Sequence, residues 1–146
     1  MAGPARALTL ATLGAWLVKA SGAEPSTREH VHAGFVDAAA WCVRPTYRTG
    51  LVAAGQPVLL WVSGSEAGLP AGIHAHGRTT GPARDGEMPL VLVPLEDPLL
   101  RAELVGHPDL AALEVLRMPA GSNPSYVTPA QLDVLVGMRE ELIRPA

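Results

Sequence analysis

The chain has 146 residues, of which 48% are hydrophobic and 4% aromatic, and its formal net charge is −3. This length and apolar content fit one domain with a single core. The acidic balance excludes a protein that coats nucleic acid non-specifically, because Lys and Arg supply most of that affinity. Any nucleic-acid binding is therefore expected to be local and confined to a pocket.

The start of the chain and its cysteine content bear on the compartment. The apolar run after Arg6 is similar to a secretory signal, but cleavage near Ala23 would remove the first predicted strand, and the run is too short to span a membrane. The single cysteine, Cys42, cannot form an internal disulfide. We expect a cytoplasmic protein without membrane association, with residues 1–12 as a flexible extension and residues 13–146 as a single domain.

The first third of the chain predicts strands separated by short helices. Ala15–Ala20 is the first predicted strand, and Ser26 with Glu29 three residues later is a capping-box signature for a short helix that ends at Gly34. Two further elements are expected, namely a strand over Ala38–Arg44 and a helical turn over Thr46–Ala54.

Two apolar runs between Pro57 and Gly77 form the central feature of the sequence. In the first run, alternation places one set of side chains on one face and a second set on the other: Leu59, Trp61 and Ser63, against Val58, Leu60 and Val62. In the second run, Ile73 and Ala75 are expected on one face, and His74 and His76 on a polar face. The glycine-bearing turn between the runs is interpreted as the floor of a pocket.

The second half of the chain predicts further strands and helices. Residues 80–87 are a loop by composition, and Thr128 with Gln131 forms a capping box for a helix over Pro129–Ile143. Four elements lie between them: a strand over Met88–Leu95 at an edge or bend, a helix over Asp97–Leu104, a strand over Glu114–Met118, and a tight turn over Gly121–Pro124.

Taken in order, several segments resemble the EVE domain of the PUA-like superfamily. These segments are WLVKA at Trp16, WCVRPTYR at Trp41, PVLLWVSGSEAGLPAGIHAHG at Pro57 and GSNPSYVT at Gly121. The resemblance covers about Ala15 to Leu142. It implies an α+β fold, a small mixed β-barrel with flanking short helices and a C-terminal helix. It also implies a protein that holds a modified base of DNA or RNA in an aromatic-lined pocket.

The residue types that could hold such a base are present. An aromatic face replaces the lost base stacking at about 1–3 kcal/mol per base, and polar groups read the base edge. The candidates for base binding are Trp16, Lys19, Trp41, Trp61, Ser63, Gly64, Ser122 and Asn123. Asn123 is of interest because its amide both donates and accepts hydrogen bonds. Arg44, Arg48 and Arg78 are the candidates for contacts with the nucleic-acid backbone.

Each candidate also has a purely structural interpretation. The three tryptophans are equally well explained as core residues. Ser122 and Asn123 could cap a turn before Pro124. The arginines could be solvated surface residues of a chain whose composition is typical of a GC-rich, bacterial genome.

Metal binding is the alternative to base binding, and its candidates are two His-x-His pairs, His30 with His32 and His74 with His76. On a strand, this spacing puts both imidazoles on one face, as metal sites often require. The carboxylate that would complete a cupin-like motif is missing after His76, and a pair at i and i+2 on a helix diverges. Ser63 and Cys42 lack the surroundings of an activated nucleophile.

The sequence therefore predicts a non-catalytic reader of a modified nucleobase that uses no cofactor and no metal. Two alternatives stay open, a metal-dependent enzyme that uses the histidine pairs, and a small-molecule or protein-interaction module on the same fold. The sequence makes no prediction of the oligomeric state.

Overall fold

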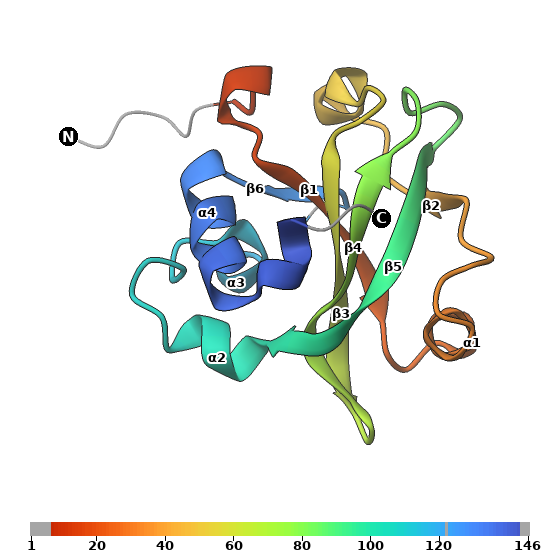
Figure 1. The fold of residues 1–146 in the computed structure, drawn as a ribbon. Coiled ribbons are helices and arrows are strands. Elements are labelled where there is room, and N and C mark those ends of the chain that lie inside the picture. Colours follow the sequence, from red (N-terminus) through yellow and green to blue (C-terminus); the bar gives the residue numbers. More distant parts are fainter. Residues whose placement is uncertain (1–6, 122, 144–146) are drawn as a thin grey trace.

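The computed structural model describes residues 7–121 and 123–143. Its centre is a curled, six-stranded half-barrel sheet in the order β2-β5-β4-β3-β1-β6, flanked by short helices (Figure 1). The strands are β1 (Ala15–Ser21), β2 (Ala40–Cys42), β3 (Pro57–Glu66), β4 (Leu69–Thr79), β5 (Glu87–Leu100) and β6 (Ser125–Val127). The predicted fold class, a small mixed barrel-like sheet with flanking helices, is confirmed.

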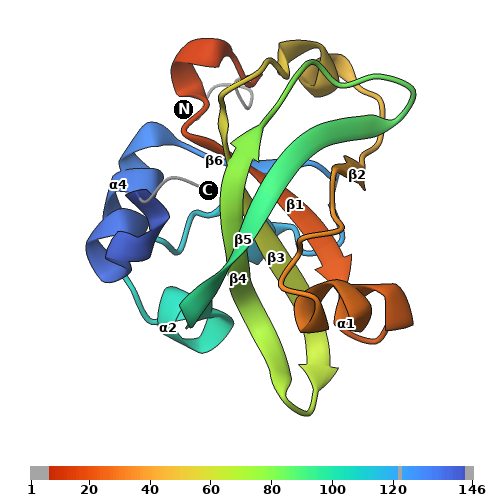
Figure 2. The same cartoon turned by 45° about the vertical axis from the view of Figure 1, so that its right-hand side comes forward.

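The helices lie on both sides of the sheet. They are α1 (Pro25–His32), α2 (Arg101–Val105), α3 (Glu114–Arg117) and α4 (Pro129–Met138), with 3-10 turns η1 (Leu10–Thr12), η2 (Tyr47–Leu51) and η3 (Glu140–Ile143). Helices α2, α3 and α4 gather on one side of the sheet, and α1 lies on the other side near β2 (Figures 1 and 2). The sheet is mixed because β1 runs parallel to β3 and antiparallel to β6.

The alternation predicted for the first apolar run is confirmed in β3. Val58, Leu60 and Val62 enter one core cluster together with Trp16 and Val18. The neighbouring residues of β3 and β1 enter a second cluster beneath the helices, which contains Ala15, Leu17, Leu59 and Trp61. One strand therefore supplies both cores, because successive side chains of an extended chain point to opposite faces.

The faces predicted for the second run are wrong. In the pairing of β4 with β3, Leu60 faces Ala75 and the next residue, Trp61, faces Ile73, so His74 is an extra residue of β4. Ile73 joins the helix-side core and Ala75 joins the other core. An extra residue in a strand moves every following side chain to the opposite face. His74 and His76 are also buried, with 8% and 5% of their surface exposed, so this strand has no polar face at that point.

Three other predicted elements are corrected. The predicted helix over Asp97–Leu104 begins only at Arg101, because β5 continues to Leu100, which pairs with Gly72 of β4. Strand β5 extends to Leu100 and not only to Leu95, and β2 pairs only with its first three residues, Glu87–Pro89. The register of β5 against β4 is irregular between Pro94 and Leu99, which agrees with the predicted edge or bend. The segment Glu114–Met118 forms helix α3 instead of a strand, and the last strand is β6.

The C-terminal helix begins as predicted and ends early. The Thr128 hydroxyl accepts a hydrogen bond from the backbone N–H of Gln131, whose side chain accepts one from the N–H of Thr128, so the capping box is confirmed. The helix stops at Met138, because Arg139 adopts an extended conformation before η3. The Arg139 side chain binds Asp97 and Glu103 across the end of β5.

Two observations concern the predicted extension and membrane association. Within residues 7–12, Leu8 is buried, and its backbone N–H donates a hydrogen bond of 2.9 Å to the Tyr47 hydroxyl. Residues 1–6 of the predicted extension lie outside the described residues. In the described part of the chain, no helix has the length and apolar character needed to cross a bilayer.

Candidate functional site

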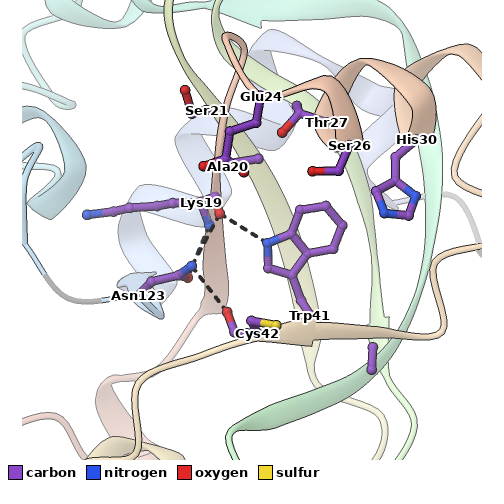
Figure 3. Close-up of a pocket in the computed structure, with 11 residues that line it drawn as sticks. Lys19, Ala20, Ser21, Glu24, Ser26, Thr27, His30, Trp41, Cys42 and Asn123 are labelled. Carbon is purple, nitrogen blue, oxygen red and sulfur yellow. Dashed lines mark hydrogen bonds between the residues drawn. The ribbon is translucent and has the colours of Figure 1, made fainter.

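A cleft of about 370 Å³ opens between the end of β1, helix α1 and strand β2 (Figure 3). Small-molecule sites typically span about 300 to 1,000 Å³. The cleft is lined by Lys19, Ala20, Ser21, Glu24, Ser26, Thr27, His30, Ala40, Trp41, Cys42 and Asn123. Three predicted ligand-binding residues, Lys19, Trp41 and Asn123, thus lie at one cleft although they come from three distant parts of the chain.

Trp41 supplies the aromatic surface of the cleft. Its indole Nε1–H donates a hydrogen bond of 3.0 Å to the Lys19 carbonyl, which ties β2 to β1 and fixes the plane of the ring. The His30 ring lies beside it, with 5.5 Å between the ring centroids and a tilt of 48°. The indole is partly exposed, so a flat ligand can reach it.

The first turn of α1 supplies polar groups on the opposite wall. Glu24 occupies the N-cap position and Pro25 the first helical position. Ser26 therefore lies inside the first turn, where its hydroxyl faces the cleft, and the predicted capping box of Ser26 with Glu29 is wrong. Figure 3 shows Glu24, Ser26 and Thr27 together on the α1 side of the cleft.

Asn123 lines the cleft, but its amide is already engaged. Its Oδ1 accepts a hydrogen bond of 3.1 Å from the Lys19 N–H, and its Nδ2 donates to the carbonyls of Lys19 at 3.2 Å and Cys42 at 3.3 Å. Both donors of the amide are thus used (Figure 3). The amide joins β1 and β2, which leaves little capacity for reading a base.

The Lys19 side chain leaves the cleft. It extends away from Trp41 in Figure 3, and its Nζ donates a hydrogen bond of 3.4 Å to the Gly121 carbonyl. Burial lowers the pKa of Lys19, with a smaller lowering from Arg48, while Glu114 acts in the opposite direction. The part of Lys19 that forms the cleft with Trp41 and Asn123 is therefore its backbone.

Arg48, predicted to contact phosphate, is held in a structural ion pair. Its two terminal nitrogens donate to the Glu114 carboxylate at 2.7 and 2.8 Å, and its guanidinium lies 5.1 Å from the centre of the Tyr126 ring. Only 18% of the Arg48 side chain is exposed. The hydrogen bonds to Glu114 raise the pKa of Arg48 further, against the opposing effect of burial. Arg44 and Arg78 are exposed and do not line the cleft.

The other predicted residues lie away from the cleft. Trp16 is fully buried, and its Nε1–H donates to Gln56 at 2.7 Å, while Trp61 is 4% exposed in the helix-side core. Ser63 is exposed at the end of β3 and donates to the Ala20 carbonyl at 3.3 Å, and Gly64 follows it with a φ of 109°. Ser122 lies outside the described residues.

The turn interpreted as a pocket floor is instead the tip of the β3–β4 hairpin. Residues 63–68 are all exposed, and the hairpin projects from the rest of the sheet (Figure 2). Sequence reasoning missed Glu24, Ser26, Thr27 and His30 as cleft residues. One feature of the sequence could have identified them. A short helix is predicted between two strands that each carry a tryptophan, and this order brings the helix N-terminus near one of those rings.

The histidine pairs do not form a metal centre in the described structure. His74 hydrogen-bonds through Nε2 to the Pro70 carbonyl, and His30 packs against Trp41 while His32 is exposed. Among residues 7–121 and 123–143, no group of three or more His, Cys, Asp or Glu side chains lies close enough to hold a metal ion.

Comparisons with known proteins identify the fold alone. No protein-family model matches the sequence, and no curated protein matches it. The structure is similar to the NMR structure of Rpa0253 from Rhodopseudomonas palustris, with a TM-score of 0.65 and 19% sequence identity over 90% of this chain and 97% of that chain. The two chains therefore share a curled half-barrel architecture over nearly their whole lengths.

Proposed function

We propose that this cytoplasmic protein is a non-catalytic binding module that holds one modified nucleobase of DNA or RNA against Trp41 in the cleft. The observation that carries the proposal is the partly exposed indole, fixed by its hydrogen bond to Lys19 and placed beside His30 in a cleft of ligand size. A base taken out of a stack regains stacking on such a ring, at about 1–3 kcal/mol.

Two further features support a base over other flat ligands. The wall opposite Trp41 offers the Ser26 and Thr27 hydroxyls and the Glu24 carboxylate, which can read the edge of a base. The sequence also resembles the EVE domain, which belongs to a superfamily of small barrel-like modules, and the curled half-barrel sheet is compatible with that family. This resemblance is the reason for proposing a modified base in particular.

The test uses intrinsic tryptophan fluorescence. Trp16 and Trp61 are buried in the two cores, so a base that stacks on Trp41 is expected to quench only that residue. The titrants are short DNA and RNA oligonucleotides with and without methylated or hydroxymethylated cytosine and methylated adenine, together with the free nucleosides. Selective quenching by one modified member, absent in Trp41→Ala, is the expected result.

Two variants serve as controls. Trp41→Phe retains a ring for stacking and loses the hydrogen bond to Lys19, so weaker binding is expected in that variant when it is followed by calorimetry. Tyr47→Ala removes an exposed aromatic side chain outside the cleft and is expected to bind like the wild type. If no oligonucleotide or nucleoside binds to the folded wild-type protein at millimolar concentration, the proposal is wrong.

A further inference from the structure

Glu24 brings a carboxylate to the wall of the cleft that faces Trp41. Its side chain makes no hydrogen bond or ion pair with any described residue, whereas Glu114 is held by Arg48 and Ser125, and Glu103 by Arg139. An ionised carboxylate only accepts hydrogen bonds. The cleft thus has a strong acceptor that the rest of the fold leaves available.

Thr27 lies near Glu24 in the first turn of α1 and is nearly buried. Only 3% of Thr27 is exposed, yet it lines the cleft, and its hydroxyl makes no hydrogen bond to a described residue. No buried side-chain oxygen of the described residues lacks a hydrogen-bond partner, so the Thr27 hydroxyl is reached by solvent from the cleft, where a ligand atom can replace water as its partner. This observation is independent of the charge on Glu24.

The described residues of the cleft wall near β1 and β2 include the Ser21 hydroxyl and the Cys42 thiol but no ionised acceptor. The Lys19 carbonyl already accepts hydrogen bonds from Trp41 and Asn123, and the Asn123 amide donates both of its N–H groups to backbone carbonyls. A bound ring would therefore be read from the α1 side of the cleft. The groups on that side are Glu24, Ser26, Thr27 and His30.

We propose that Glu24 selects the bound base by its exocyclic amino group, with the ring on Trp41 and the Thr27 hydroxyl as a second hydrogen-bonding partner. This inference rests on the proposed base binding and narrows its ligand to the bases with an exocyclic amino group, which are cytosine, adenine and guanine. Their amino groups donate to a carboxylate, while the carbonyl of uracil, thymine or hypoxanthine in the same position would repel it.

Matched nucleosides test the selection directly. 5-Methylcytidine carries an amino group where 5-methyluridine carries a carbonyl. Adenosine and inosine differ in the same way. Their dissociation constants are measured with the full chain by calorimetry and by quenching of Trp41. In at least one pair, the member with the amino group is expected to bind about tenfold more tightly. The member with the carbonyl cannot donate the charge-assisted hydrogen bond to Glu24.

Glu24→Gln tests the contribution of the carboxylate while the other groups of the cleft stay unchanged. A glutamine amide presents either a donor or an acceptor, so the variant is expected to lose the tenfold preference while it still quenches Trp41. Glu29→Gln removes an exposed carboxylate of the same helix that does not line the cleft, and it is expected to keep the preference. Thr27→Val retains the shape of the buried side chain and is expected to weaken the binding of the preferred nucleoside severalfold.

The outcomes distinguish this inference from the proposed function. Equal binding within both pairs by the wild type, or an unchanged preference in Glu24→Gln, would overturn the selection by Glu24 and leave base binding intact. If none of the four nucleosides binds to the folded wild type, and the modified oligonucleotides also fail, base binding and the selection are both wrong. Circular dichroism of each variant confirms that it is folded.

Discussion

Asn123 and Lys19 form a reciprocal pair, in which the Asn123 amide accepts from the Lys19 N–H and donates to the Lys19 carbonyl. This is the pattern that a neighbouring strand would present to β1. The same amide reaches the Cys42 carbonyl, and the Asn123 carbonyl accepts from the Arg44 N–H at 2.6 Å. One side chain therefore joins β1 to β2 at the wall of the cleft.

Asn123→Ala is expected to destabilise the protein by about 2 to 3 kcal/mol, because three side-chain hydrogen bonds of about 1 kcal/mol each are lost. Urea unfolding followed by circular dichroism measures the change as a lower midpoint at constant slope. Asn123→Asp is also expected to destabilise, since a carboxylate cannot donate to the carbonyls of Lys19 and Cys42. The exposed Ser65→Ala is the control, and an Asn123→Ala midpoint equal to that of Ser65→Ala would contradict this role.

The ion pair of Arg48 with Glu114 is expected to make stability sensitive to acid. Burial raises the pKa of Glu114, but the hydrogen bonds from Arg48 and Ser125 outweigh it and hold the pKa below its usual value of 4.5. A carboxyl whose pKa is lower in the folded state contributes its stability above the unfolded pKa and loses it as the pH falls through the folded pKa. Below about pH 4.5, the wild type is therefore expected to lose this contribution.

Glu114→Gln measures that contribution. The variant is expected to be less stable than the wild type at pH 7 and to converge with it as the pH is lowered below about 4.5, in urea titrations from pH 7 to pH 3. Glu87→Gln replaces an exposed carboxyl and is expected to follow the wild-type curve. Parallel curves for wild type and Glu114→Gln over the whole range would show that the ion pair is not responsible.

Two Gly→Ala substitutions are expected to act in opposite directions. A Cβ added at Gly77 would overlap the Val91 carbonyl of the neighbouring strand, so Gly77→Ala is expected to cost about 3 kcal/mol or more. A Cβ at Gly137 meets no atom within 4 Å, and the residue lies in helix α4. Gly137→Ala is therefore expected to stabilise by about 0.5 to 1 kcal/mol. Thermal unfolding of both variants against the wild type provides the comparison.

Binding of a modified oligonucleotide is expected to depend weakly on salt. The Arg28 guanidinium donates to the carbonyls of Gly22 and Ala23, Lys19 to Gly121, and Arg48 to Glu114, so these cations near the cleft already have partners. Arg44 is exposed beside Asn123 and is the candidate for one phosphate contact. The logarithm of Kd should then rise with the logarithm of salt concentration at a slope of about 1.

Arg44→Ala is expected to reduce this slope toward zero, and Arg101→Ala, which removes an exposed arginine on α2, is expected to leave it unchanged. Fluorescence titrations at 50 to 300 mM salt measure both. A slope of 3 or more in the wild type would mean that the protein tracks the phosphate backbone with residues that these contacts do not identify.

Local sequence signals determined a large part of the fold. The alternation of β3 divides its side chains between two cores as the pattern predicts, and the Thr128 and Gln131 capping box starts α4 at Pro129. Both depend on residues close in sequence, where the periodicity of the chain and the chemistry of a helix N-terminus are sufficient. Trp41 and Asn123 are also among the base-binding candidates that the sequence predicts, and both line the cleft.

Long-range pairing decided the rest. Asp97-Pro98 is a good helix start, but pairing with β4 keeps the chain extended through Leu100. The extra residue His74 of β4 reverses the faces that simple alternation predicts. Trp61 has the same local appearance as Trp41, yet it is buried because helices cover its face of the sheet. The sequence therefore offered candidates for a binding surface, of which Trp41 and Asn123 line the cleft and Trp16 and Trp61 do not. Only the packing of α1 against the curled sheet decided that Trp41 meets Glu24 and Thr27 at one cleft, because those contacts join segments that carry no local signal for one another.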